Sequence, residues 1–179
     1  MGNEAGRPRQ NWQKSAARVV FGLVWAVDAA FKWRPAFRHE YLSLVRGAAQ
    51  GQPAWLLPWF HLWIALIAPR VPFFAYATAI IESVIALGLI LGFARKLVYW
   101  LTVVFGLLIW STAEGFGGPY TAGATDVGTG IVYSLAAVFL LALNATAGTS
   151  PYSLDAILER RIPWWPVVAE VGGRPRRPA

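Results

Sequence analysis

The stretch that decides the fold is 73-FFAYATAIIESVIALGLILGF-93, an apolar run whose single charged residue is Glu82. At about 1.5 Å per helical residue, a run of this length can cross a hydrocarbon core of about 30 Å. The basic pair Arg95-Lys96 follows directly, and a second apolar run covers residues 97–113. Two apolar runs joined by a short basic turn predict a membrane hairpin with its turn in the cytoplasm.

Two further apolar runs, residues 16–33 and 127–145, complete the membrane domain predicted for residues 16–145. The predicted fold class is all-α: an integral membrane four-helix bundle with spans at 16–33, 73–93, 97–113 and 127–145. The outer segment 35–72 contains an apolar stretch, 54–68, that is too short to span and is interrupted by Pro58. We expect this stretch to form a helical segment in the outer interface. Trp55, Trp59 and Trp63 share one face, which lies at headgroup depth or closes over the bundle.

Composition supports the membrane class and excludes several kinds of site. More than half of the 179 residues are hydrophobic, and ten are Trp, which suits the aromatic belts of a spanning protein. The chain has no cysteine, two histidines and one methionine. A disulfide framework and an iron-sulfur cluster are therefore excluded, and no metal or haem site is expected. Any redox role must use an electron carrier supplied by another molecule.

The net charge of +7 lies mainly on one side of the predicted membrane. Most of the Lys and Arg residues fall in the basic arm 1–15, at Arg18, in the Arg95-Lys96 turn and in the segment 146–179. Positive loops stay in the cytoplasm, so we expect a multi-pass protein of the cell membrane with both termini cytoplasmic. The basic face predicts membrane lipid as a partner and no nucleic acid.

The C-terminal segment 146–179 is predicted to be a cytoplasmic amphipathic segment followed by a basic tail. Leu154, Ile157 and Leu158 share one helical face, and Ser153 is a candidate N-cap. A short surface helix is expected here.

Ionisable residues within the spans are the candidate site residues. Asp28 and Lys32 are one helical turn apart, which predicts an ion pair. Glu82 has no basic residue within a turn, so its partner must come from another helix, or it must be protonated. Charges at bilayer depth are costly, and Glu82 is therefore the best single functional candidate.

A glycine-rich connection, 114-EGFGGPY-120, follows the third span, and Asp126 precedes the fourth. Glycines let the backbone approach a ligand or a neighbouring helix end closely, and Asp126 is also well placed as a helix N-cap. The predicted topology gathers Asp28, Lys32, Glu82, Glu114 and Asp126 in the outer half of the bundle. Such a pocket suits proton transfer, a quinone headgroup or a small polar substrate.

Three motifs together resemble the DoxX/DoxD family of small four-helix membrane proteins: 18-RxxxGxxWxxDAAxKWxPxF-37, 114-EGxGGPY-120 and 125-TDxGTxxxY-133. DoxD-like members resemble the large subunit of a thiosulfate:quinone oxidoreductase. The resemblance implies quinone as a substrate, a catalytic set comprising Asp28, Lys32, Glu82, Glu114 and Asp126, and quinone-binding neighbours Trp25, Trp110 and Tyr120.

Two hypotheses remain open from the sequence, beside a third possibility, a proton-coupled or cation pathway through Glu82. The first is a membrane subunit of a quinone-linked oxidoreductase, with thiosulfate as a candidate electron donor. The second is a non-enzymatic membrane anchor or accessory subunit of a larger respiratory or redox-stress complex, in which the buried charges pair to hold the bundle together. Both predict a protein partner or a homo-oligomer.

Overall fold

The structure is a computed structural model that describes residues 7–118, 126–147 and 152–172, and these residues form helices without any strand. The predicted all-α class is therefore confirmed. The helices are α1 (Arg7–Lys32), α2 (Pro35–Ala48), α3 (Leu57–Ile67), α4 (Val71–Leu91), α5 (Arg95–Thr112), α6 (Thr129–Ala147), α7 (Leu154–Arg161) and α8 (Pro166–Ala169). Short 3₁₀ turns occupy Ala68–Arg70 and Gly115–Gly117.

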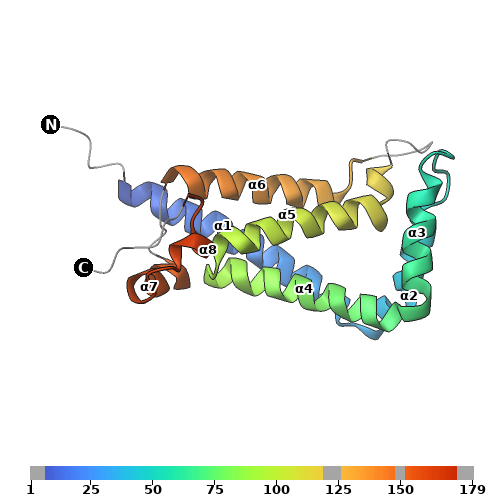
Figure 1. Ribbon diagram of the computed structural model, residues 1–179, viewed down its shortest axis with the longest axis horizontal. Helices are drawn as coiled ribbons and strands as arrows, with labels where there is room; N and C mark the ends of the chain where they lie inside the picture. Colours follow the sequence, from blue (N-terminus) through green and yellow to red (C-terminus); the bar gives the residue numbers. More distant parts are fainter. Residues whose placement is uncertain (1–6, 119–125, 148–151, 173–179) are drawn as a thin grey trace.

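Four long helices, α1, α4, α5 and α6, run along the length of the molecule (Figure 1). Each of them covers most of one predicted span. The described ends of the chain and the short helices α7 and α8 lie at one end of the bundle, and α2 and α3 lie at the other (Figure 1). Residues 173–179, most of the predicted basic tail, lie outside the described residues.

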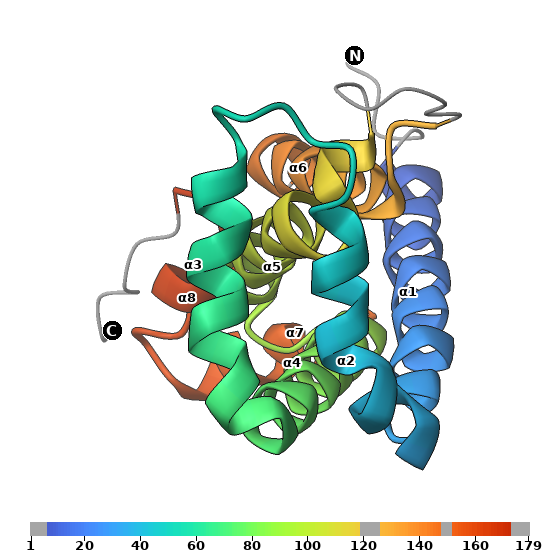
Figure 2. The ribbon, with the colours of Figure 1, turned by 90° about the vertical axis from the view of Figure 1, so that its right-hand side faces the viewer.

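The outer segment forms two helices that lie across the end of the bundle (Figure 2). The sequence predicted a helical segment at 54–68, and α3 occupies most of it. The stretch is not one continuous helix: residues 54–56 form a turn, and Pro58 stands in the first turn of α3, where a proline needs no backbone hydrogen bond. Arg70, with φ −140° and ψ 34°, separates α3 from α4. Helix α2 was not predicted.

Judged by length and composition, one helical stretch in the described part of the chain could cross a membrane, Leu57–Leu91. This stretch includes the bend between α3 and α4, so its straight portion is α4. An apolar helix at Thr129–Ala145 is shorter.

Large apolar side chains cover the outward faces of all four long helices. They recur every three or four residues, so each helix presents an apolar stripe away from the core. These exposed side chains are Val20, Leu23, Val27 and Phe31 in α1, Ile80, Val84, Leu87 and Leu91 in α4, Leu97, Trp100, Val104 and Leu107 in α5, and Val132, Leu135, Val138 and Phe139 in α6.

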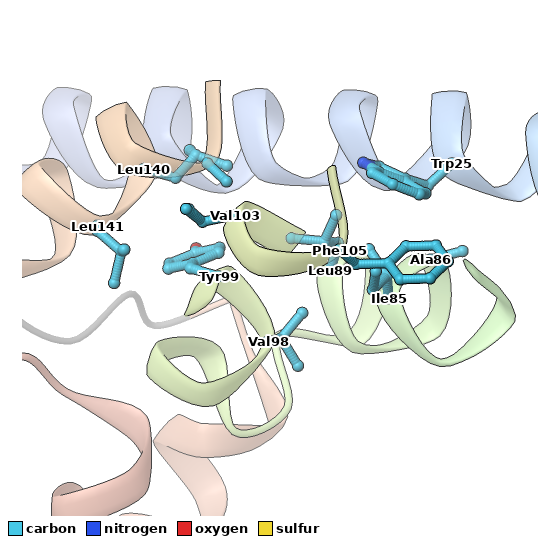
Figure 3. Close-up of a cluster of buried hydrophobic side chains, with 11 residues drawn as sticks. Trp25, Ile85, Ala86, Leu89, Val98, Tyr99, Val103, Phe105, Leu140 and Leu141 are labelled. Carbon is cyan, nitrogen blue, oxygen red and sulfur yellow. The ribbon is translucent and has the colours of Figure 1, made fainter. Parts of the chain in front are cut away.

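The core between the helices combines bulky side chains with close approaches of helix backbones. Figure 3 shows Trp25 of α1 above Ile85 and Leu89 of α4 and Phe105 of α5, which belong to one buried cluster. Helices α5 and α6 meet at Gly106, where an added Cβ would lie 2.5 Å from Ser134 Oγ and 2.9 Å from the carbonyl oxygen of Gly130. Small residues at this crossing let the two backbones touch.

The C-terminal segment is attached to the bundle by a buried ion cluster centred on Arg95, at the start of α5. Arg95 Nε lies 2.9 Å from Asp155 Oδ2, and its Nη2 lies 3.5 Å from Glu159 Oε1 and contacts Glu170. Asp155 also accepts hydrogen bonds from the backbone N–H groups of Ala94 (2.7 Å) and Arg95 (3.0 Å), so it caps α5. The sequence analysis did not identify this cluster.

The cluster sets the orientation of α7. The predicted N-cap is confirmed, since Ser153 Oγ accepts from the backbone N–H of Ala156 at 3.2 Å. The acidic side chains Asp155 and Glu159 face the bundle, whereas the apolar Leu154 and Ile157 are exposed, Ile157 to 53%. The apolar face therefore points outward because Arg95 attracts the acidic face.

Glu170 should make the attachment of the C-terminal segment pH-dependent. Burial and the neighbouring Glu159 together raise the pKa of Glu170 to about 7, against the attraction of Arg95. A raised pKa in the folded state means that protonation of Glu170 stabilises the fold. This stability is fully present below the pKa of the unfolded state and is lost as pH rises through 7. Amide exchange of α7 and α8 should therefore be slower at pH 5.5 than at pH 8.

The Glu170→Gln variant is the control, because an amide of the same shape does not titrate. It should show a weaker pH dependence of exchange than the wild type, after correction for the intrinsic exchange rate. An unchanged dependence in this variant would assign the effect to another group.

Candidate functional site

A cavity of about 710 Å³ lies in the half of the bundle next to α2 and α3. Its walls come from α1, α4, α5 and α6, and side chains of α2 and α3 close it at the end of the bundle. Sites for small molecules commonly have volumes of about 300–1,000 Å³ and mainly apolar walls with few polar groups. By size and lining, this cavity is the candidate ligand site.

The structure brings most of the predicted site residues to this cavity. Trp25, Asp28, Lys32, Glu82 and Glu114 all line it. Trp110 and Asp126 are not among the lining residues, and Tyr120 lies outside the described residues.

Asp28 and Lys32 form the predicted ion pair, with 3.1 Å between Lys32 Nζ and Asp28 Oδ1. Lys32 Nζ also lies 5.1 Å from the centre of the Phe37 ring, which adds a cation–π contact. Both charged side chains are partly exposed, so the pair forms a neutral but accessible part of the wall.

Glu114 is held by the start of α6. Its Oε2 accepts a hydrogen bond of 2.8 Å from the backbone N–H of Gly130, in the first turn of that helix. Burial raises the pKa of Glu114, while the hydrogen bonds from the backbone of Gly130 and Thr129 lower it. Glu114 thus caps α6 from a position 16 residues earlier in the chain than Gly130, at a helix end that attracts negative charge.

Asp126 forms a local turn ahead of α6. Its Oδ1 accepts from the backbone N–H of Gly128 at 2.7 Å, forming a local turn ahead of α6, which begins at Thr129. Asp126 is therefore not the direct N-cap of the helix.

Trp110 supports the same loop from outside the cavity. Its Nε1 donates to the carbonyl oxygen of Val127 at 2.8 Å, and its ring packs against Phe116 with centroids 5.1 Å apart. These contacts give Trp110 a structural role.

Glu82 is the least satisfied polar side chain of the cavity wall. It is 0% exposed, and neither carboxylate oxygen has a hydrogen-bond partner among the described residues. The indole Nε1 atoms of Trp25 and Trp63, which also line the cavity, are likewise buried without an acceptor in the described part of the chain. Buried polar groups are normally paired, so three unpaired groups around one cavity indicate a ligand site.

Sequence reasoning missed several residues of the wall. Tyr41 of α2 donates to or accepts from Thr78 Oγ1 at 3.0 Å, and Tyr133 of α6 packs against Trp25 with centroids 5.2 Å apart. Trp63, expected on an aromatic face at headgroup depth or closing over the bundle, lines the cavity. Tyr133 ends the third motif, which was the available signal for it.

Comparison with protein-family models, with curated proteins and with solved structures finds no match to this chain. The resemblance to DoxX/DoxD proteins therefore stays a prediction.

Proposed function

We propose that this chain is a multi-pass membrane protein with both termini in the cytoplasm. The apolar stripes on α1, α4, α5 and α6 support lipid-facing surfaces. The 21 residues of α4 correspond to about 31 Å, close to a hydrocarbon core of about 30 Å. Arg160 and Arg161 belong to α7, and Lys96 Nζ donates to a backbone carbonyl of α8 at 2.7 Å. This gathering of basic residues supports a cytoplasmic placement of the end formed by α7 and α8.

We further propose that the outer cavity binds a quinone headgroup, and that the chain is a DoxX/DoxD-like membrane subunit of a quinone-linked oxidoreductase. The observation that carries this proposal is the set of unpaired polar groups around the cavity. The indole N–H groups of Trp25 and Trp63 suit carbonyl oxygens of a quinone, and Lys32 adds a third donor.

Quinone reduction requires protons as well as electrons. Glu82, Asp28 and Glu114 at the cavity wall are the groups that would deliver protons to the ring oxygens. A partner subunit must supply the electrons, with thiosulfate as the candidate donor. The chain itself has no cysteine for an iron-sulfur cluster or a redox disulfide.

The test is mass spectrometry of the protein gently extracted from the membrane fraction. The wild type should carry quinone. Because a lost hydrogen bond of about 1 kcal/mol reduces affinity roughly fivefold, Trp63→Phe should retain roughly fivefold less quinone. Trp100→Phe, which changes an exposed tryptophan of α5, should retain the wild-type amount. Recovery in the soluble fraction would contradict the membrane proposal, and absence of quinone would contradict the ligand.

A second function is favoured by how the other charged groups are used. Asp28 pairs with Lys32, and Glu114 caps α6, so these residues have structural partners. This pattern suits a non-enzymatic anchor or accessory subunit. Recovery of a stable protein partner without quinone in the same mass spectrometry experiment would support that function.

A further inference from the structure

We propose that the same cavity binds a lipophilic organic cation, such as a substituted ammonium or phosphonium, with the carboxylate of Glu82 as its counter-ion. This inference rests on the membrane placement proposed above and is independent of quinone binding. It adds a second class of ligand to the cavity.

The charge balance of the wall is acidic. Asp28, Glu82 and Glu114 face one basic residue, Lys32, among the described residues that line the cavity. Lys32 is paired with Asp28 at 3.1 Å, and Glu114 is held by the backbone N–H of Gly130. Glu82 is then the carboxylate left without a hydrogen-bond or ion-pair partner in the described structure. An ionised carboxylate in an apolar environment is costly until a cation pairs with it.

The rest of the wall is aromatic. Rings from six helices line the cavity, including Trp25, Phe37, Trp63, Phe73, Phe105 and Tyr133. The faces of aromatic rings attract cations, and the attraction is strongest where water is excluded. Rings around a carboxylate favour an organic cation over a metal ion, which needs several oxygen ligands in its coordination sphere.

The cavity also reaches the surface proposed to face lipid. Val24, Val27 and Phe31 line it and are exposed on the outer side of α1, Val27 to 59%. An apolar rim of this kind admits a ligand from the bilayer. The cation should therefore carry apolar substituents.

Binding of tetraphenylphosphonium to the purified full-length protein in a nonionic detergent tests the proposal. This probe is apolar, permanently charged and does not titrate. Because Glu82→Gln removes the counter-ion of a desolvated cation, it should weaken binding of the probe roughly tenfold or more. Glu40→Gln, which makes the same change at an exposed position of α2, should leave it unchanged. Tetraphenylborate, an anion of similar shape, should not bind at the cavity.

The pH dependence provides a second readout. Wild-type binding should weaken between pH 8 and pH 5, because protonation removes the charge of Glu82. The other ionisable groups facing Glu82 across the cavity are Asp28, Lys32, Tyr41, Glu114 and Tyr133. The dependence is therefore compared with that of Glu82→Gln, in which it should largely disappear.

Glu82→Asp keeps the proposal testable if Glu82→Gln folds poorly. It retains the charge and should bind tetraphenylphosphonium better than Glu82→Gln. The inference would be overturned if wild type and Glu82→Gln bound tetraphenylphosphonium equally, or if the wild type bound tetraphenylborate equally well. It would also be overturned if folded Glu82→Asp bound tetraphenylphosphonium as weakly as Glu82→Gln. Quinone without cation binding would reject this inference alone, and cation binding without quinone would reject the proposed oxidoreductase role alone.

Discussion

Replacing Arg95 with methionine should release the C-terminal segment from the bundle. Arg95 is 3% exposed and contacts Asp155, Glu159 and Glu170. Removing one partner from a buried ion cluster leaves uncompensated charge, which costs about 3–5 kcal/mol. Hydrogen exchange across α7 and α8 should rise sharply in the purified full-length variant, while exchange in α4 changes much less.

Two further variants separate charge from position. Arg160→Met removes an arginine from the exposed side of α7 and should leave exchange unchanged. Arg95→Lys should be intermediate, because an ammonium group cannot reproduce the several directed contacts of a guanidinium group. Wild-type exchange in Arg95→Met would show that the cluster does not hold the segment.

Replacing Gly106 with leucine should disrupt the packing of α5 against α6. Even a Cβ at this position would lie 2.5 Å from Ser134 Oγ and 2.9 Å from the carbonyl oxygen of Gly130. The backbone of α6 must therefore move, and overpacking of this kind costs about 3 kcal/mol. The variant should unfold in detergent at a distinctly lower temperature than the wild type.

Gly47→Leu is the matched control. Gly47 lies within α2, and apart from its chain neighbours and its own helix backbone no atom lies within 4 Å of the position that its Cβ would take. The substitution should be neutral or stabilise the protein by up to about 1 kcal/mol, because leucine favours helix over glycine. Similar losses of stability in both variants would reject the close α5–α6 contact as the cause.

The site was predictable where its residues lie close together in the chain. The Asp28–Lys32 pair follows from a spacing of four residues in one helix. The isolation of Glu82 followed from the lack of a basic residue within a turn, and in the structure its oxygens have no partner among the described residues. The roles of Glu114 and Asp126 were not separable, because both acids lie near the start of α6 and only the folded loop decides which one reaches the helix.

The sequence by itself determined the all-α class and the approximate positions of the helices, because apolar runs, prolines and glycines act within a few residues of one another. Tertiary structure alone decided the pairing of Arg95 with the acids of the C-terminal segment, at sequence separations of 60 or more. It also decided that α2 and α3 fold over the cavity and place Trp63 and Tyr41 in its wall. Periodicity records which face of a helix is apolar, but the partner of that face depends on how the whole chain packs.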